Sequence, residues 1–344
     1  MKNLASELDE ERRTVSFDSY DITVRQLLDM VESKNIDIAP DYQRQFVWDQ
    51  ARESAFIESV FLGIPIPSLF MATNKDSTWE LVDGVQRIST LLHFCGSAEA
   101  RKMVGKNSGL ILEELEKLPS FNEQAYNDLP KSLQLAFQLR SIRVTTLNDK
   151  SDLKVRFDLF ERLNTGGVRL QPQEIRNCIY RGEFNNLLKN LASKAAFRKA
   201  AKVKSSSENN GTREELVLRF FAFLERYTAF DHSVNDFLNE YMGDYNDRHP
   251  SSANMTLFDK TFDFLATELP KGITRGTRTS VTPVNLFEAI AVGTALAIKS
   301  KGAAKKGVVK KLLNDFTLKG LTTGGTNSNR MVVGRINYVR DKLA

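Results

Sequence analysis

Residues 78–94, TWELVDGVQRISTLLHF, join a short apolar strand pattern directly to the pattern of an amphipathic helix. Asp83 and Gly84 stand between the two, and Gln86 and Arg87 open the helix. A glycine permits a tight turn from strand to helix, and the N–H groups of the first helical turn then point outward without partners. The stretch therefore predicts an α/β unit with a polar corner where a strand meets a helix.

The side chains at this corner suit a phosphate ligand. A helix N-terminus attracts anions, and the guanidinium of Arg87 can form two parallel hydrogen bonds to phosphate oxygens. A cation in the first turn opposes the helix dipole unless an anion joins it, which favours a ligand. Asp83 would hold Mg²⁺ against the same phosphates. The alternative is a simple Asp-Gly turn with Asp83 as a helix cap.

A second motif lies upstream, in APDYQRQFVW at residues 39–48. Aromatic side chains mixed with arginine can stack on a base and reach a phosphate. The candidate ligand-binding residues here are Tyr42, Gln43 and Arg44. Phe46 and Trp48 have an alternative role as core residues at the start of the next helix.

A third motif, FERLNTGGVRLQPQEIRN, occupies residues 160–177. It predicts a helix end, a Gly-Gly turn and a new helix after Pro172. The candidates for ligand contact are Arg162, Asn164, Gly166 and Gly167, and Glu161 would position water or a metal ion. The alternative is an ordinary helix C-cap followed by an N-cap.

The rest of the chain has two kinds of organisation. Up to about residue 148, short strands alternate with helices, and beyond Gln173 every strong pattern is helical. We therefore predict an α+β protein with a mixed α/β domain at 1–175 and a helical domain at 176–344. The predicted elements are strands at 14–22, 36–40, 64–72, 78–83 and 140–148; helices at 23–35, 48–63, 85–95 and 149–164, with a helical stretch at 110–139 that a polar turn interrupts at 120–130; and in the second half helices at 214–230, 256–269, 284–298 and 307–316.

Composition limits the class of protein. The 344 residues are 41% hydrophobic and 26% charged, which is ordinary for a soluble globular protein. No run of about 18 apolar residues predicts a membrane span, and the first residues lack the apolar core of a signal peptide. Two unpaired cysteines fit a reducing compartment, and three scattered histidines argue against zinc. We expect a cytoplasmic protein without a membrane partner.

The net charge of +5 is unevenly distributed. Residues 299–342 contain eleven Lys or Arg and two Asp, a balance of +9, and residues 189–204 contain six basic residues and no acid. Solvated helix faces explain such runs, and so does a surface for nucleic acid or an acidic partner, because clustered cations bind phosphates with release of counterions. Bulk charge does not separate these two explanations.

The motifs in their order resemble the N-terminal domain family of GmrSD-type restriction endonucleases, within the ParB/sulfiredoxin-like superfamily. The resemblance rests on PDYQRQFVW, IESVFLGIPIP, LVDGVQRISTL and FERLNTGGVRLQPQEIRN, and it spans roughly residues 14–180. The family's Asp-Gly-Gln-Gln-Arg loop reads Asp83-Gly84-Val85-Gln86-Arg87 here. The superfamily's Gly-x-x-Arg phosphate element is kept from Gly84 to Arg87, whereas Val85 replaces a polar side chain.

The resemblance implies a nucleotide-binding component of an anti-phage defence or restriction-like system. Its ligand would be a nucleoside triphosphate with Mg²⁺, with GTP, CTP or UTP in preference to ATP. Asp83, Gln86 and Glu161 would be the catalytic residues of a slow NTPase, and Asp83 and Glu161 would be the metal ligands. The only His-Pro, at residues 249–250, has no second histidine nearby, so we expect no HNH-type nuclease in this chain.

The expected partners are DNA and a separately encoded effector or nuclease, and a homodimer is left open. A different class of function is a non-catalytic DNA-binding or antitoxin-like regulatory module that keeps the fold. Val85 and the basic segment at residues 299–342 favour that alternative.

Overall fold

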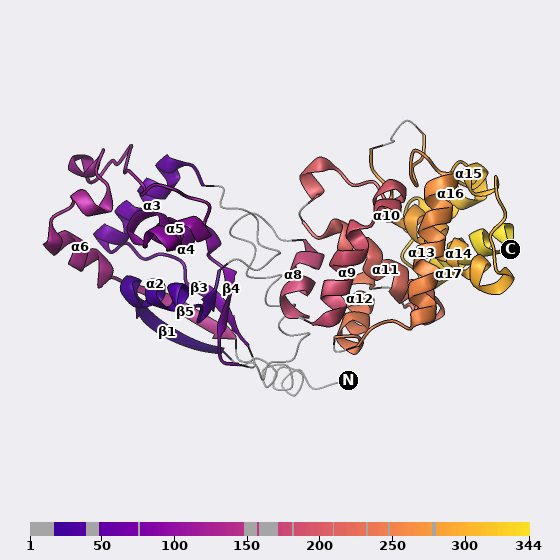
Figure 1. Cartoon of the computed structure of the whole chain (residues 1–344), viewed down its shortest axis with the longest axis horizontal. Helices are drawn as coiled ribbons and strands as arrows, with labels where there is room; N and C mark the ends of the chain where they lie inside the picture. The colour runs from indigo at the N-terminus through magenta and orange to yellow at the C-terminus, as the bar shows by residue number, and fades with distance from the viewer. Residues whose placement is uncertain are drawn as a thin grey trace, which may run out of the picture. The chain divides into compact units, whose positions relative to one another are not determined.

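The computed structural model describes residues 17–38, 48–74, 76–147, 157, 171–180, 182–208, 210–231, 233–246, 248–276 and 280–344. Contacts divide the chain into two compact units, Met1–Arg169 and Leu170–Ala344. The first, the α/β unit, contains a mixed sheet with helices, and the second, the helical unit, contains only helices among its described residues (Figure 1). The predicted α+β class is confirmed. The contact boundary lies a few residues before the predicted one at 175/176.

The sheet of the α/β unit has the strand order β1-β5-β3-β4-β2. β1 pairs with β5, and β3 with β4, in antiparallel fashion, whereas β3 with β5 and β2 with β4 are parallel. The sheet therefore contains both parallel and antiparallel pairs. The strands are β1 (Phe17–Thr23), β2 (Ile36–Asp37), β3 (Leu69–Thr73), β4 (Trp79–Asp83) and β5 (Ser141–Leu147).

Apolar faces of the helices form the core of this unit together with the strands. In α4, Ile88, Leu91 and Leu92 are fully buried, and they belong to one cluster with residues of α2, α3 and α6. The spacing of these residues along α4 is that of one helix face. The helices are α2 (Val24–Glu32), α3 (Gln50–Leu62), α4 (Val85–Cys95), α5 (Ala98–Met103) and α6 (Lys131–Gln138).

Two predicted elements of this unit are wrong in extent. The helical stretch predicted at 110–139 is helical only in α6 and in two 3-10 turns, Pro119–Phe121 and Tyr126–Asp128. Glu114 and Glu123 adopt positive φ angles of 55° and 65°, which an α-helix does not allow. The apolar residues whose spacing predicted a helix there lie instead in a folded loop, and most of its leucines are buried.

The third predicted strand, 64–72, begins only at Leu69. Pro65 and Pro67 lie just before it, and proline has no N–H with which to extend a ladder. β3 therefore pairs with β5 only from Leu69, opposite Val144. The predicted helix at 149–164 lies outside the described residues, except Phe157, which is helical and buried.

The helical unit packs around phenylalanine rings. The Phe258 centroid lies 4.5 Å from that of Phe262 and 5.3 Å from that of Phe220. The predicted helix at 307–316 is wrong in extent, because Asp315 caps a new helix through Leu318 N–H at 2.8 Å. The helices are α8 (Pro172–Ile179), α9 (Glu183–Ser193), α10 (Ala195–Ala200), α11 (Thr212–Arg226), α12 (Val234–Asp244), α13 (Ser252–Glu268), α14 (Val284–Lys301), α15 (Val309–Leu312), α16 (Phe316–Thr322) and α17 (Asn329–Leu343).

A chain of alternating charges, here called the ion-pair ladder, crosses this unit from α8 to α17. Arg176 pairs with Glu215 at 3.1 Å, and Glu215 pairs with Arg219 at 2.7 Å. Arg219 reaches Glu288 at 2.7 Å, and Glu288 also accepts from Arg335. The side chains of Arg176, Glu288 and Arg335 are fully buried. Each buried charge thus has an opposite neighbour, which burial requires.

No helix in the ranges given above is long and apolar enough to cross a membrane.

Candidate functional site

The corner between β4 and α4 is formed by a glycine that no other residue can replace without strain. Gly84 is the N-cap of α4 with φ 110°, a conformation that L side chains rarely adopt. A Cβ atom at this position would lie 2.3 Å from Leu69 Cδ2. The tight approach brings the start of α4 against the start of β3.

Arg87, in the first turn of α4, is held by three acceptors. Its Nη2 donates to Asp83 Oδ2 at 2.6 Å, and its Nη1 donates to the carbonyls of Ser68, at 3.2 Å, and Pro67. Burial lowers the pKa of Arg87, and the charge of Asp83 opposes that change. The sequence argument expected an external anion beside this cation, whereas the structure provides Asp83 as a counter-charge.

The amides at the start of α4 have no side-chain cap within the described part of the chain. Gly84 has no side chain, no side-chain hydrogen bond caps the helix, and no acid stands in its first turn, as judged from the described residues. The N–H groups of such a turn are the donors that bind anions at helix N-termini. Val85 is half-buried and packs against the core, so this position adds no polar group to the corner.

Gln86 connects the first two motifs. Its Oε1 accepts the Trp48 N–H at 3.2 Å, so the last residue of the stretch at 39–48 is fixed beside the corner. Trp48 is half-buried and its ring contacts Phe56 edge-on, with centroids 5.8 Å apart. For Trp48 the structure therefore favours the core role. Through this hydrogen bond Gln86 ties the start of α4 to the residues just before α3, and its catalytic role stays a prediction.

Most of the other predicted site residues lie outside the described residues. This holds for Tyr42, Gln43, Arg44, Glu161, Arg162, Asn164, Gly166 and Gly167. Asp83, Gly84, Gln86 and Arg87 are described, and the structure brings these four together at one corner.

The predicted Mg²⁺ ligands were Asp83 and Glu161. Asp83 holds Arg87, and 39% of its side chain is exposed, so one face of the carboxylate is accessible. No group of three His, Cys, Asp or Glu residues able to hold a metal ion occurs in the part of the chain that the structure describes. Glu161, the other predicted ligand, lies outside the described residues.

A buried polar cluster in the same unit was missed by the sequence reasoning. Glu53, on α3, is fully buried, and its Oε2 lies 2.5 Å from Nδ1 of His93, on α4. Lys106 Nζ reaches the other oxygen of Glu53 at 3.3 Å. The cluster ties α3 to α4 below the corner. A glutamate among the apolar residues of α3 is the sequence signal that could have indicated it.

Comparison with known families agrees with this geometry. The fold and the corner define a class of protein: an α/β unit in which a glycine turn is followed by an arginine in the first turn of a helix. Residues 24–181 match the family described as GmrSD restriction endonuclease, N-terminal domain, and this part of the chain belongs to that family. Comparison with curated proteins gives no match.

Proposed function

We propose that the α/β unit binds a nucleoside triphosphate at the corner from Asp83 to Arg87, as one component of a restriction-like defence system. The observation that carries this proposal is the start of α4, where uncapped amides and the Arg87 guanidinium converge behind Gly84. Membership of the GmrSD N-terminal domain family supports the same reading and points to restriction. The nucleotide would be GTP, CTP or UTP in preference to ATP.

Binding would exchange one ion pair for others. The phosphates would accept from the amides of α4 and from Arg87, and Asp83 would hold Mg²⁺, which would neutralise phosphate charge. In this proposal Arg44, Asn164, Gly166 and Gly167 also contact the nucleotide, and Glu161 orients the attacking water. Since Val85 offers no polar group, we expect hydrolysis to be slow.

Titration of the full chain with each of the four nucleotides and Mg²⁺ tests the site. We expect saturable binding that weakens about tenfold or more in Arg87→Ala, since a charge-assisted hydrogen bond contributes about 1.5–3 kcal/mol. Arg101→Ala is the matched control, because Arg101 also donates to a backbone carbonyl, that of Gly96 at 2.8 Å, but at the far end of α4. Calorimetry gives the affinity, and phosphate release in the same samples gives the turnover.

Arg87→Lys keeps the charge at the corner and guards against a folding defect in Arg87→Ala. A folded Arg87→Ala chain that binds as tightly as the natural chain contradicts the assignment. A folded Arg101→Ala chain that loses binding as much as Arg87→Ala would also contradict the assignment, because the loss would not be specific to the corner.

A second function, nucleic-acid binding by the helical unit, is favoured by one surface observation. Seven lysines between α14 and α16 are exposed, and none forms an ion pair within the described residues; they are Lys299, Lys301, Lys305, Lys306, Lys310, Lys311 and Lys319. Phe316, in their midst, is 90% exposed. In this proposal, the helical unit couples the nucleotide state to DNA or to a separately encoded effector. An antitoxin-like module would use the same surface without turnover.

The salt dependence of DNA affinity tests this second function. We expect log affinity to fall linearly with log salt, with a slope of about 0.9 per phosphate contact. Lys310→Gln combined with Lys311→Gln should lower that slope by the contribution of about two phosphate contacts. Lys260→Gln, at an exposed position of α13, should leave the slope unchanged. Fluorescence anisotropy with a labelled duplex measures both. If the double substitution leaves the slope unchanged, these lysines do not bind DNA phosphates.

A further inference from the structure

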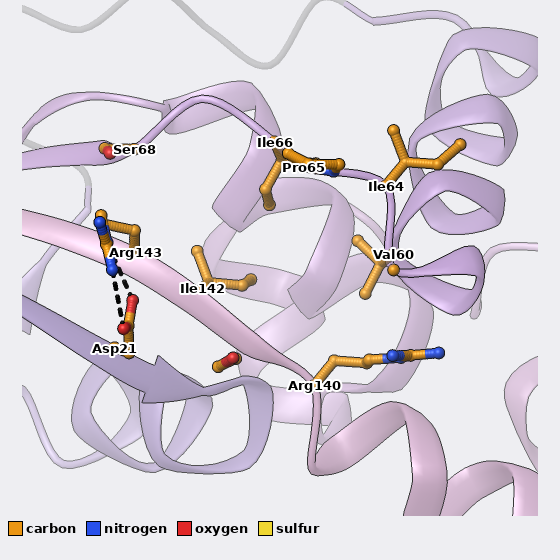
Figure 2. Close-up of a pocket in the computed structure, with 11 residues that line it drawn as sticks. Asp21, Val60, Ile64, Pro65, Ile66, Ser68, Arg140, Ile142 and Arg143 are labelled. Atoms are coloured by element: carbon orange, nitrogen blue, oxygen red, sulfur yellow. Dashed lines mark hydrogen bonds and ion pairs between the residues drawn. The ribbon is translucent and has the colours of Figure 1, made fainter.

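A pocket of about 410 Å³ opens at the amino end of β5, beside but separate from the Asp83–Arg87 corner (Figure 2). Over Ser141–Arg143, β5 pairs with β1 on one edge only. On the other edge β3 starts at Leu69, because Pro65 and Pro67 cannot donate to the ladder. The chain before β3 therefore diverges from β5, and the divergence leaves the pocket.

The middle of the pocket is apolar. Val60 and Ile142 line it from the core and are only 4% and 1% exposed, whereas Ile66 is half-buried and Ile64 stands at the rim with 51% of its surface exposed. Figure 2 shows these side chains between two arginines, with Arg143 on one side and Arg140 on the other. An apolar floor with a few polar groups at its ends is the usual composition of a small-molecule site, and the volume lies within the usual range.

The two arginines differ in their charge balance. Arg143 donates to both oxygens of Asp21, at 3.0 Å and 2.9 Å, and this hydrogen bond holds the pKa of Asp21 below its usual value. That pair is electrically neutral at pH 7. Arg140 Nη2 donates to the Phe61 carbonyl at 2.6 Å, and no carboxylate pairs with Arg140 among the residues described. Within the described part of the chain, the exposed Arg140 is thus the lining cation without a carboxylate partner.

Arg140 is also held in place. Its guanidinium lies against Gly63, where a Cβ atom would be 2.9 Å from Nη1. Gly63 is the C-cap of α3 with φ 70°, so the turn that ends this helix also makes room for the guanidinium. A preorganised arginine with unused N–H donors binds a carboxylate at a lower entropic cost than a mobile side chain does.

We propose that this pocket binds a small organic monocarboxylate with an apolar body, with its carboxylate on Arg140 and its body on Ile64 and Ile66. Among the described residues that line the pocket, Arg140 is the cation without a carboxylate partner, which matches one negative charge. Because Arg143 is already neutralised by Asp21, a second negative charge would find no cation, so a monocarboxylate fits better than a phosphate or a dicarboxylate. The proposal does not rest on nucleotide binding, because Arg87 does not line the pocket.

Ligand-observed NMR on the full chain tests the proposal with phenylacetate and 4-methylpentanoate as probes. We expect saturable binding at or below about 1 mM, the range of a single small anion. The neutral analogue phenylacetamide and the dianion phenyl phosphate should each bind at least about tenfold more weakly, because the amide lacks the charge and the second charge of the phosphate has no cation to pair with. A tripeptide ending in a free leucine carboxylate shows whether the natural ligand is a peptide or a free acid. If it binds more tightly than 4-methylpentanoate, the carboxylate belongs to a peptide C-terminus. If it binds more weakly, the carboxylate belongs to a free acid.

Two variants localise the site. Arg140→Gln removes the cation, and Ile64→Asp places a competing carboxylate at the exposed rim, so each should weaken phenylacetate binding about tenfold or more. Arg25→Gln makes the same charge change at an exposed position of α2 outside the pocket and should leave binding unchanged. The absence of saturable binding by either acid overturns the proposal. So does an affinity that Arg140→Gln leaves intact, or equal binding of phenylacetamide.

Discussion

Glu288→Gln should lower the free energy of unfolding by about 3–5 kcal/mol, because removing one partner leaves buried charges uncompensated. Glu288 is fully buried and lies between Arg219 and Arg335 in the ion-pair ladder. Glutamine has nearly the same shape, so the change removes charge without opening a cavity. The loss would fall on α11, α14 and α17 together, which the ladder joins. Urea denaturation followed by circular dichroism measures it.

Asp259→Asn provides the control for this prediction. Asp259 pairs with Lys194 at 2.5 Å, but about half of each side chain is exposed, and such pairs contribute about 0–1 kcal/mol. If both variants lose the same free energy of unfolding, the ion-pair ladder stabilises the helical unit no more than an exposed ion pair does.

Gly84→Ala should destabilise the α/β unit by about 3 kcal/mol, combining the strain of a positive φ with the overlap of the new Cβ and Leu69. The same substitution should distort the start of α4 and thereby weaken nucleotide binding. Thermal and urea denaturation of the full chain measure the stability change.

Gly105→Ala separates the two causes. Gly105 also has a positive φ, 74°, but nothing lies within 4 Å of its added Cβ. We expect a loss of about 1 kcal/mol there, from the backbone alone. If Gly84→Ala costs no more than Gly105→Ala, the close approach of Leu69 is not a constraint.

Helix ends show how far local sequence determined this structure. Threonine is a preferred N-cap residue, and the hydroxyl of Thr23 accepts the Gln26 N–H at 3.2 Å at the start of α2. Glycine commonly ends helices, and Gly63 ends α3 in the left-handed conformation. Gly84 was expected at a tight turn from strand to helix. These features depend on neighbours within four residues, which is why the sequence alone predicts them.

The extents of β3 and of the stretch after α5 show the limit of such reasoning. The apolar pattern at 64–72 was assigned to one strand, although Pro65 and Pro67 already stood in the sequence as signals against its first half. The leucines before α6 have helix-like spacing but are buried within a folded loop. Periodicity records which side chains are buried, and different backbones can bury the same pattern.

By itself, the sequence determined the succession of an α/β unit and a helical unit, the glycine turn after β4 and the place of Arg87 in the next helix. Only the tertiary structure decided the partners of the charged groups. Arg87 is held by Asp83 and by two carbonyls that precede β3, and Arg335 reaches Glu288 from 47 residues away. The physical reason is that a buried charge must find an opposite charge or a dipole, and which one lies within reach depends on how distant helices and strands pack.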